Sequence, residues 1–337
     1  MAPNDKIEKI IARMQKRIAE GQYYEAQQQT RVVAARHIKA ANWPAAIDIL
    51  YNVAQALLKA GQGGSGGDLA VFLIDVYKQA ELKPEPTARG RVLTLLRLFA
   101  ADEPTRKKYI TEAIAWSAKF GEFPAGDPEL HHVVGSLYAQ EHDPYDAERH
   151  LLTGTKDSAD VLARMEYTWY TQDDPHTAGL YAGRAVLPFL LVANVRAANQ
   201  SYRTFTDLLV AQNPNLTAQN VSSVSADARV FPSLPLLNFL GLLLLAVQRG
   251  SPDMFRQLTT KYAANLRDET AEAPWNDAIE TIAEMYFNIQ RPRQSNPLFD
   301  MMGSLFGGAG GGGGGGGGSS NNRGAGRIEA PVAEGLD

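Results

Sequence analysis

The sequence predicts an all-α protein, an α-solenoid built from antiparallel helical hairpins. Apolar residues recur at helical spacing in one segment after another, and short turns separate these segments. Residues 21–26, 42–46 and 143–147 open in the same way, with a small or polar residue, an aromatic residue and an alanine. These openings start 21 and then 101 residues apart. We therefore expect a degenerate, tetratricopeptide-like array without the regular period of about 34 residues.

The N-terminal half, residues 5–155, shows the pattern from its first residues. Ile7, Ile10, Ile11, Met14 and Ile18 lie on one face of the first expected helix. Helices are expected over residues 5–20, 23–41, 43–60, 88–100, 105–120, 128–141 and 144–152. The glycine-rich residues 61–67 are expected to form a loop, followed by Asp68 as the N-cap of a helix that stops near residues 83–86.

The C-terminal half, residues 156–292, continues the array with one interruption. Short alternating apolar residues between 213 and 233 predict a small β-hairpin inserted between helices. Helices are expected over residues 157–171, 175–192, 197–212, 234–249, 252–266 and 273–289. Residues 293–337 hold a glycine tract with little to bury and are expected to be a disordered tail.

The charge of the chain is unevenly distributed. The net charge is −4, yet residues 1–40 carry eight Lys and Arg against four acidic residues. The acidic total argues against a nucleic-acid binder, and the basic N-terminal end suggests a partner with an acidic patch. Ordinary solvated helix faces would show the same composition, so both interpretations remain open.

The composition also indicates the cellular compartment of the protein and whether it inserts into a membrane. The sequence has no cysteine and no apolar stretch at its N-terminus, as in a cytosolic protein without a secretory signal. Its most apolar run, residues 234–247, has 14 residues, whereas a membrane span needs about 20. We expect a soluble cytoplasmic protein that does not insert into the membrane.

No catalytic or metal-binding pattern stands out. His131 and His132 lie near Asp127 and Glu129, but the spacing of two histidines on one helix face with an intervening glutamate is absent. The glycines at 61–67 are followed by Asp68 rather than by the Lys and Ser or Thr of a phosphate-binding loop. We expect no enzymatic activity, no metal and no cofactor.

Two segments have the composition of binding surfaces. Tyr23 and Tyr24 stand among arginines and lysines at a helix start, and we expect one of the two to pack inside the hairpin. The expected helix 234–249 is apolar nearly all round, so both of its sides must be covered. Two interpretations remain open: the helix is covered by a partner segment, or it is covered by the chain's own core.

Several of these stretches together resemble a known family. They are residues 18–26, 59–69, 115–120, 126–131 and 145–149, with 286–289 and 300–306 near the end. They closely resemble the fungal Golgi-to-ER traffic protein four family over roughly residues 7–307. The residues 213–233 and the glycine tail match least.

The resemblance implies a non-enzymatic solenoid adaptor for post-translational delivery of tail-anchored membrane proteins to the ER. Such adaptors bind the ubiquitin-like-domain protein of the pathway, traffic protein five, and through it the Sgt2 co-chaperone. They dock the targeting ATPase, traffic protein three, and restrain its ATP hydrolysis until a client is loaded.

The resemblance also implies two sets of site residues. By position, the family's ATPase-binding face maps onto Lys16, Arg17, Tyr23, Tyr24, Arg31, Arg36, Lys39 and Asp68. The region that binds the ubiquitin-like partner maps onto the hairpin and the apolar helix, at Val230, Phe231, Leu237, Leu240 and Leu244. The alternative is a structural helical-repeat subunit of a proteasome-lid-type assembly, although the winged-helix C-terminus of such subunits is not visible.

Overall fold

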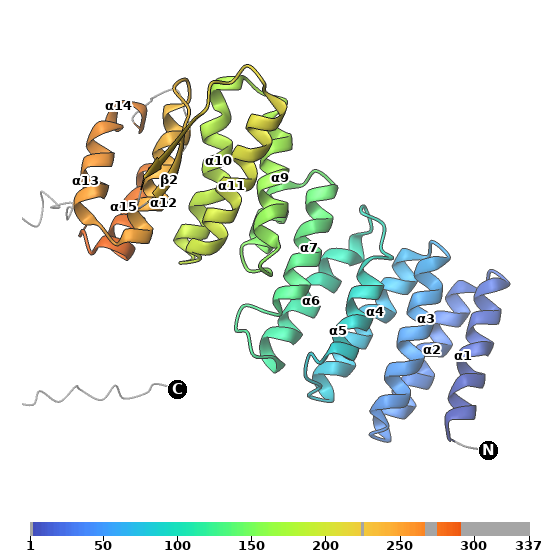
Figure 1. The fold of residues 1–337 in the computed structure, drawn as a ribbon. Helices are drawn as coiled ribbons and strands as arrows, with labels where there is room; N and C mark the ends of the chain where they lie inside the picture. Colours follow the sequence, from blue (N-terminus) through green and yellow to red (C-terminus); the bar gives the residue numbers. More distant parts are fainter. Residues whose placement is uncertain (1–2, 224–225, 267–274, 291–337) are drawn as a thin grey trace, which may run out of the picture. The chain divides into compact units, whose positions relative to one another are not determined.

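The computed structural model describes residues 3–223, 226–266 and 275–290, and Figure 1 shows their fold. All of them lie in one unit, Met1–Gln290. The described part is helical apart from one two-stranded hairpin. The prediction of an all-α solenoid is confirmed, and the expected disordered tail lies outside the described residues.

The first eight helices follow the predicted order closely. They are α1 (Pro3–Ala19), α2 (Tyr23–Lys39), α3 (Trp43–Lys59), α4 (Gly63–Gln79), α5 (Pro86–Leu96), α6 (Pro104–Phe120), α7 (Pro128–Gln140) and α8 (Pro144–Leu151). Helix α5 ends four residues before the predicted Ala100, in a turn that leads to Glu103, the N-cap of α6. Polar caps set several starts: Asp127 accepts bonds from the backbone N–H groups of Glu129 and Leu130, which the first turn of α7 leaves unsatisfied.

The remaining elements complete the array. They are α9 (Ser158–Tyr170), the 3-10 turn η1 (Pro175–Thr177), α10 (Ala178–Leu191), α11 (Val195–Gln212), β1 (Gln219–Ser223), β2 (Ala226–Val230), α12 (Pro235–Arg249), α13 (Pro252–Lys261), α14 (Ala263–Leu266) and α15 (Trp275–Phe287). The predicted hairpin is confirmed: β1 and β2 pair antiparallel, with Gln219 opposite Val230. Residues 252–266 form two helices rather than the predicted one, since the helical pattern breaks at Tyr262.

Each helix packs mainly against neighbours one or two steps away in the sequence. Helix α3 contacts α2 and α4, α4 contacts α6, α7 contacts α8, and α9 contacts α10 and α11. Figure 1 shows the same succession from the blue N-terminal helices to the orange C-terminal ones. The buried side chains form one continuous core from Met14 to Phe287. Contacts restricted to near neighbours are the property that defines a solenoid.

The glycine-rich residues form the start of a helix, which corrects the prediction of a loop over 61–67. Helix α4 begins at Gly63, so Asp68 lies inside the helix and does not cap it. A Cβ atom on Gly66 would lie 2.7 Å from Leu58 Cγ, and one on Gly67 would lie 2.1 Å from Thr105 Oγ1. Helical glycine costs about 1 kcal/mol relative to alanine. Here that cost permits α4 to lie directly against α3 and the start of α6.

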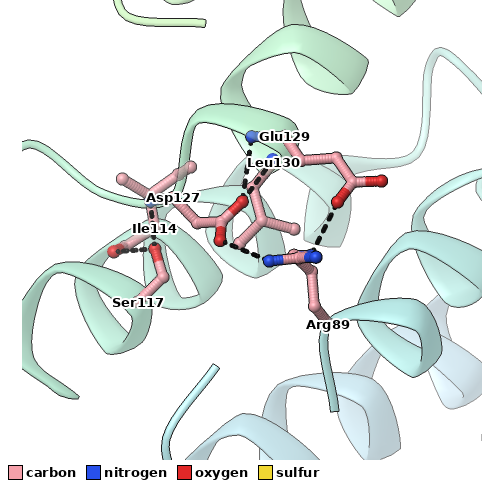
Figure 2. Close-up of polar contacts among 6 residues, drawn as sticks. All are labelled: Arg89, Ile114, Ser117, Asp127, Glu129 and Leu130. Carbon is pink, nitrogen blue, oxygen red and sulfur yellow. Dashed lines mark hydrogen bonds and ion pairs between the residues drawn. The ribbon is translucent and has the colours of Figure 1, made fainter. Parts of the chain in front are cut away.

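A polar cluster joins α5, α6 and α7, as Figure 2 shows. Arg89 on α5 donates to Asp127 at 3.0 Å and to Glu129 at 2.7 Å. Ser117 on α6 accepts a hydrogen bond from the backbone N–H of Asp127 and donates one to the carbonyl of Ile114. The Asp127 carboxylate is buried, and it serves at once as helix cap and as ion-pair partner. These contacts fix the 121–127 connection against α5.

Candidate functional site

The first candidate surface is the solvent-facing side of α2 together with the end of α1. Tyr24, Gln28, Val32, Arg36 and Lys39 share one side of α2, and all five are exposed. Tyr24 is 67% exposed and Val32 is 52% exposed, which is unusual for an aromatic and a β-branched apolar side chain. This combination of aromatic, apolar and cationic groups is typical of protein interfaces. We call these five residues the α2 face.

The two adjacent tyrosines divide as the sequence predicts. Tyr23 is half-buried and packs against the core, whereas Tyr24 projects into solvent. Two consecutive helical residues are rotated by about 100° around the axis, so only one of them can face the neighbouring helices. Tyr24 is therefore the aromatic group available to a partner.

Arg31 and Asp68 are the two predicted site residues that meet directly. Arg31 Nη1 lies 2.5 Å from Asp68 Oδ2, and this ion pair joins α2 to α4. The guanidinium also lies over the ring of Phe72, 5.2 Å from its centroid. Gln27 donates to the same carboxylate oxygen at 2.8 Å and accepts from Ser65. Both charges stay partly exposed, so this pair offers a fixed dipole beside the α2 face.

The other predicted cations lie at two ends of the surface. Lys16 and Arg17 are in the last turn of α1, where Lys16 faces Glu20 at 3.9 Å. Arg36 and Lys39 are in the last turn of α2. Because a helix rises 1.5 Å per residue, Tyr24 and Lys39 are separated by about 22 Å along the axis. A partner that touches both ends must cover the whole length of α2.

The second candidate surface is a hollow of about 720 Å³ between α11, β2, α12 and the α13–α14 turn. Tyr202, Gly241 and Tyr262 contribute to its walls. The full lining is Asn199, Tyr202, Arg203, Thr206, Asp207, Arg229, Val230, Asn238, Gly241, Leu242, Leu244, Leu245, Gln248, Lys261 and Tyr262.

Of the five residues predicted to bind the ubiquitin-like partner, two line this hollow and three do not. Val230 and Leu244 line it. Phe231, Leu237 and Leu240 are completely buried in the core of the chain and do not line it. The apolar lining comes instead from Leu242 and Leu245, which are half-buried. The apolar character of α12 is therefore explained largely by the chain's own core.

Sequence reasoning missed the α11 side of the hollow. Tyr202 donates its hydroxyl to the carbonyl of Leu237 at 3.2 Å, and burial raises the pKa of this phenol well above its usual range. A Cβ atom on Gly241 would lie 2.6 Å from the Tyr202 hydroxyl oxygen, so only glycine permits this approach. The signal in the sequence is Gly241, which interrupts an otherwise apolar helix, as a close approach of two elements would require.

The hairpin is held in place by one side chain of α12. Asn238 accepts a hydrogen bond from the backbone N–H of Phe231 at 2.7 Å and donates one to its carbonyl at 2.8 Å. The same segment buries the Phe231 ring completely. The end of β2, with Val230, is thereby anchored to the wall of the hollow.

Neither surface contains a group of side chains suited to metal binding. Across the described residues, no three His, Asp or Glu side chains gather closely enough to hold a metal ion. Within the same ranges, no helix has the length and apolar character needed to cross a membrane.

The succession of helices that pack on their near neighbours defines an α-solenoid, a class of helical-repeat protein. A family model described as Golgi to ER traffic protein 4 matches residues 40–306. The chain belongs to this family, whose place is in tail-anchored protein insertion.

The relatives agree over nearly the whole chain. Golgi to ER traffic protein 4 of Aspergillus fumigatus is 54% identical, with 90% of this chain and 91% of the relative covered. The protein of the same name in Schizosaccharomyces pombe is 35% identical over 85% of this chain and 91% of its own. The crystal structure of C. therm. Get4 has a TM-score of 0.84 and 62% identity, covering 91% of this chain and 96% of that one.

Proposed function

We propose that this chain is the adaptor that links a ubiquitin-like-domain protein, and through it the Sgt2 co-chaperone, to the targeting ATPase of the tail-anchored pathway. The α2 face and the Arg31–Asp68 pair would dock the ATPase, and the hollow beside α12 would hold the ubiquitin-like protein. The observation that supports the proposal is that the exposed α2 face and the hollow lie on separate helices, α1–α4 and α11–α14, of one family member. With one partner on each of them, a single chain would bind both partners at once.

Charge reversal at Arg36 and Lys39 tests the ATPase arm. These two exposed cations lie at one end of α2, so the double variant Arg36→Glu/Lys39→Glu removes attraction to an acidic surface without disturbing the core. We expect affinity for the ATP-bound ATPase to fall about tenfold or more at low salt, and the difference to shrink as salt rises. Titration calorimetry measures it. The double variant Lys83→Glu/Lys156→Glu carries the same charge change at exposed positions that belong neither to the α2 face nor to the lining of the hollow, and it should bind normally.

A steady-state assay of ATP hydrolysis with the same variants tests the regulatory part of the proposal. The adaptor should slow ATP hydrolysis by the ATPase, and Arg36→Glu/Lys39→Glu should relieve this restraint in proportion to the lost binding. Unchanged ATPase affinity in the double variant would refute the electrostatic docking. Normal binding with no effect on hydrolysis would leave docking intact and refute regulation.

Substitutions in the hollow test the other arm. Val230→Asp and Leu245→Asp place charges on half-buried lining residues rather than in the core. We expect the double variant to lose the ubiquitin-like protein in co-purification while its thermal transition is kept. Leu191→Asp, at an exposed leucine on α10, is the matched control and should bind normally. If affinity purification of the unaltered chain from cytosol recovers a ring of helical-repeat subunits and neither of the two partners, the result would support a scaffold role instead.

A further inference from the structure

The hollow beside α12 continues as a groove along α11. A second hollow of about 640 Å³ is lined by Val195, Arg196, Asn199, Gln200, Arg203, Thr204, Asp207 and Gln248. Four of these residues, Asn199, Arg203, Asp207 and Gln248, line the first hollow as well. The groove therefore runs from Val230 at the end of β2 to Arg196 at the start of α11. The lining residues of α11 run from Val195 to Asp207, so at 1.5 Å per residue this part of the groove is about 18 Å long.

The charge of this groove is opposite to that of the chain. Among the described residues, its lining holds four cations, Arg196, Arg203, Arg229 and Lys261, and a single carboxylate, Asp207. The chain as a whole has a net charge of −4. Arg229 lies 2.8 Å from Asp207, so the one carboxylate already has a partner.

The remaining groove cations are available to a ligand. In the part of the chain that the structure describes, Arg196, Arg203 and Lys261 form no ion pair, and all three are exposed. Asp160 on α9 contacts this wall through Thr204, from which it accepts a hydrogen bond, and it accepts another from Arg164. Both of its oxygens are thus engaged, and within the described residues it forms its ion pair with Arg164.

The polar side chains between the arginines follow one helical face. Arg196, Asn199, Gln200 and Arg203 are spaced three or four residues apart, and Thr204 and Asp207 continue this face. Asn199 accepts a hydrogen bond from Gln248 at 2.6 Å, so the part of the groove that both hollows share carries an exposed polar pair. An apolar anchor fits the leucine-lined end, and a charged polar segment fits the remainder.

We infer that the groove along α11 binds an acidic segment of the ubiquitin-like partner, with Arg196 and Arg203 pairing with its carboxylates. The inference rests on the proposed function, since it extends the partner beyond the leucine-lined hollow. Charge complementarity carries it: within the described ranges three groove cations form no ion pair, and such a groove on an otherwise acidic chain attracts an acidic ligand and repels a basic one.

The double variant Arg196→Glu/Arg203→Glu tests the inference. Both side chains are exposed, so the fold is kept, and circular dichroism melting checks this. We expect the affinity for the purified partner to fall at least about tenfold at low salt. The affinity of the unaltered chain should weaken as salt rises, whereas that of the variant should hardly respond. Lys83→Glu/Lys156→Glu is the control of equal charge.

The two proposals fail in different ways. If the unaltered chain does not bind the ubiquitin-like protein, the proposed function is wrong. If it binds, and Val230→Asp/Leu245→Asp abolishes binding while Arg196→Glu/Arg203→Glu leaves affinity and salt dependence unchanged, the acidic-segment inference alone is overturned.

Photo-crosslinking identifies the segment directly. A photo-reactive phenylalanine analogue in place of Gln200 lies between the two arginines, and the same analogue in place of Lys156 is the control. Mass spectrometry of the crosslinked complex should find a partner peptide rich in Asp and Glu at position 200 and none at position 156. A basic or uncharged peptide, or no crosslink in a complex that has formed, would contradict the inference.

Discussion

His131 on α7 and His150 on α8 lie with their Nδ1 atoms 3.0 Å apart. His131 Nε2 lies 3.0 Å from the carbonyl oxygen of Ala125, which can only accept a hydrogen bond. Nε2 of His131 therefore carries the proton, and its Nδ1 accepts from the Nδ1–H of His150. The two rings form a neutral pair across the α7–α8 hairpin, a pairing distinct from the sequence neighbours His131 and His132.

The histidine pair predicts acid-sensitive stability. Burial lowers the pKa of both residues, and that of His150 falls to about 4, with the His131 charge as a further cause. A lowered pKa means that the folded state favours the neutral form. The stabilisation is present above the ordinary histidine pKa of about 6.5 and is lost as pH falls toward 4.

The measurement is urea unfolding at pH 7.5, 6 and 4.5. The free energy of unfolding should fall with pH in the unaltered chain and fall less in His150→Leu, which cannot take up the proton. The exposed His142 provides the matched control, so His142→Leu should keep the full acid sensitivity. Parallel pH profiles for the unaltered chain and His150→Leu would contradict the assignment.

The two carboxylate partners of Arg89 should contribute unequally to the free energy of unfolding. Asp127 is buried and also caps α7, whereas Glu129 is about half exposed. Asp127→Ala removes the cap and leaves Arg89 with a weaker partner, so we expect a loss of about 2–4 kcal/mol of unfolding free energy. Glu129→Ala removes a solvent-screened contact and should cost less than about 1 kcal/mol. Equal losses in thermal or urea unfolding would show that the buried Asp127 contacts in Figure 2 stabilise the fold no more than the exposed Glu129 contact does.

The sequence predicted most helices because apolar spacing and polar caps are local properties. It placed α7 and α12 to within one residue, helped by Asp127 and by Pro235 in the first turn of α12. Residues 61–67 were mistaken for a loop because glycine has poor helix propensity, and nothing local shows that Leu58 and Thr105 leave no room for side chains.

The candidate sites were only partly accessible to sequence reasoning. Exposed cations such as Arg36 could be placed from helical spacing alone. The leucines 237 and 240 have the same local appearance as Leu242 and Leu245, and only the packing of α10, α11 and α13 around α12 separates core from groove. The pairing of Arg31 with Asp68, 37 residues apart, likewise depends on tertiary structure.

The glycines of α4 predict opposite effects at neighbouring positions. A Cβ atom on Gly64 meets nothing within 4 Å, whereas one on Gly66 would lie 3.0 Å from the backbone nitrogen of Leu58. Gly64→Ala should therefore stabilise the chain by about 0.5 kcal/mol through helix propensity. Gly66→Ala should destabilise it by about 1–3 kcal/mol because α3 and α4 are forced apart. Thermal unfolding compares the two, and a stabilising Gly66→Ala would show that the close approach is not required.

Glu166 should give the free energy of unfolding a second pH dependence, opposite in sign to that of the histidine pair. The residue is fully buried on α9, with Oε2 3.2 Å from Arg184 Nε, and across the described residues its Oε1 atom has no hydrogen-bond partner. Burial is the main cause that raises the pKa of Glu166 to about 7. The charge of Glu148, which pairs with the same guanidinium, contributes to this rise, whereas the charge of Arg184 opposes it. The folded state thus favours the protonated acid.

A raised pKa gives stabilisation that is complete below the ordinary glutamate pKa of about 4.3 and is lost as pH rises through 7. Glu166→Gln keeps the shape and stays neutral, so its free energy of unfolding should improve relative to the unaltered chain between pH 5 and 8, by about 2 kcal/mol. Glu122→Gln, at an exposed carboxylate on the α6–α7 connection, should change nothing across this range. Urea titrations at several pH values decide the matter: a constant difference between Glu166→Gln and the unaltered chain would mean that Glu166 is ionised throughout, held by Arg184 alone.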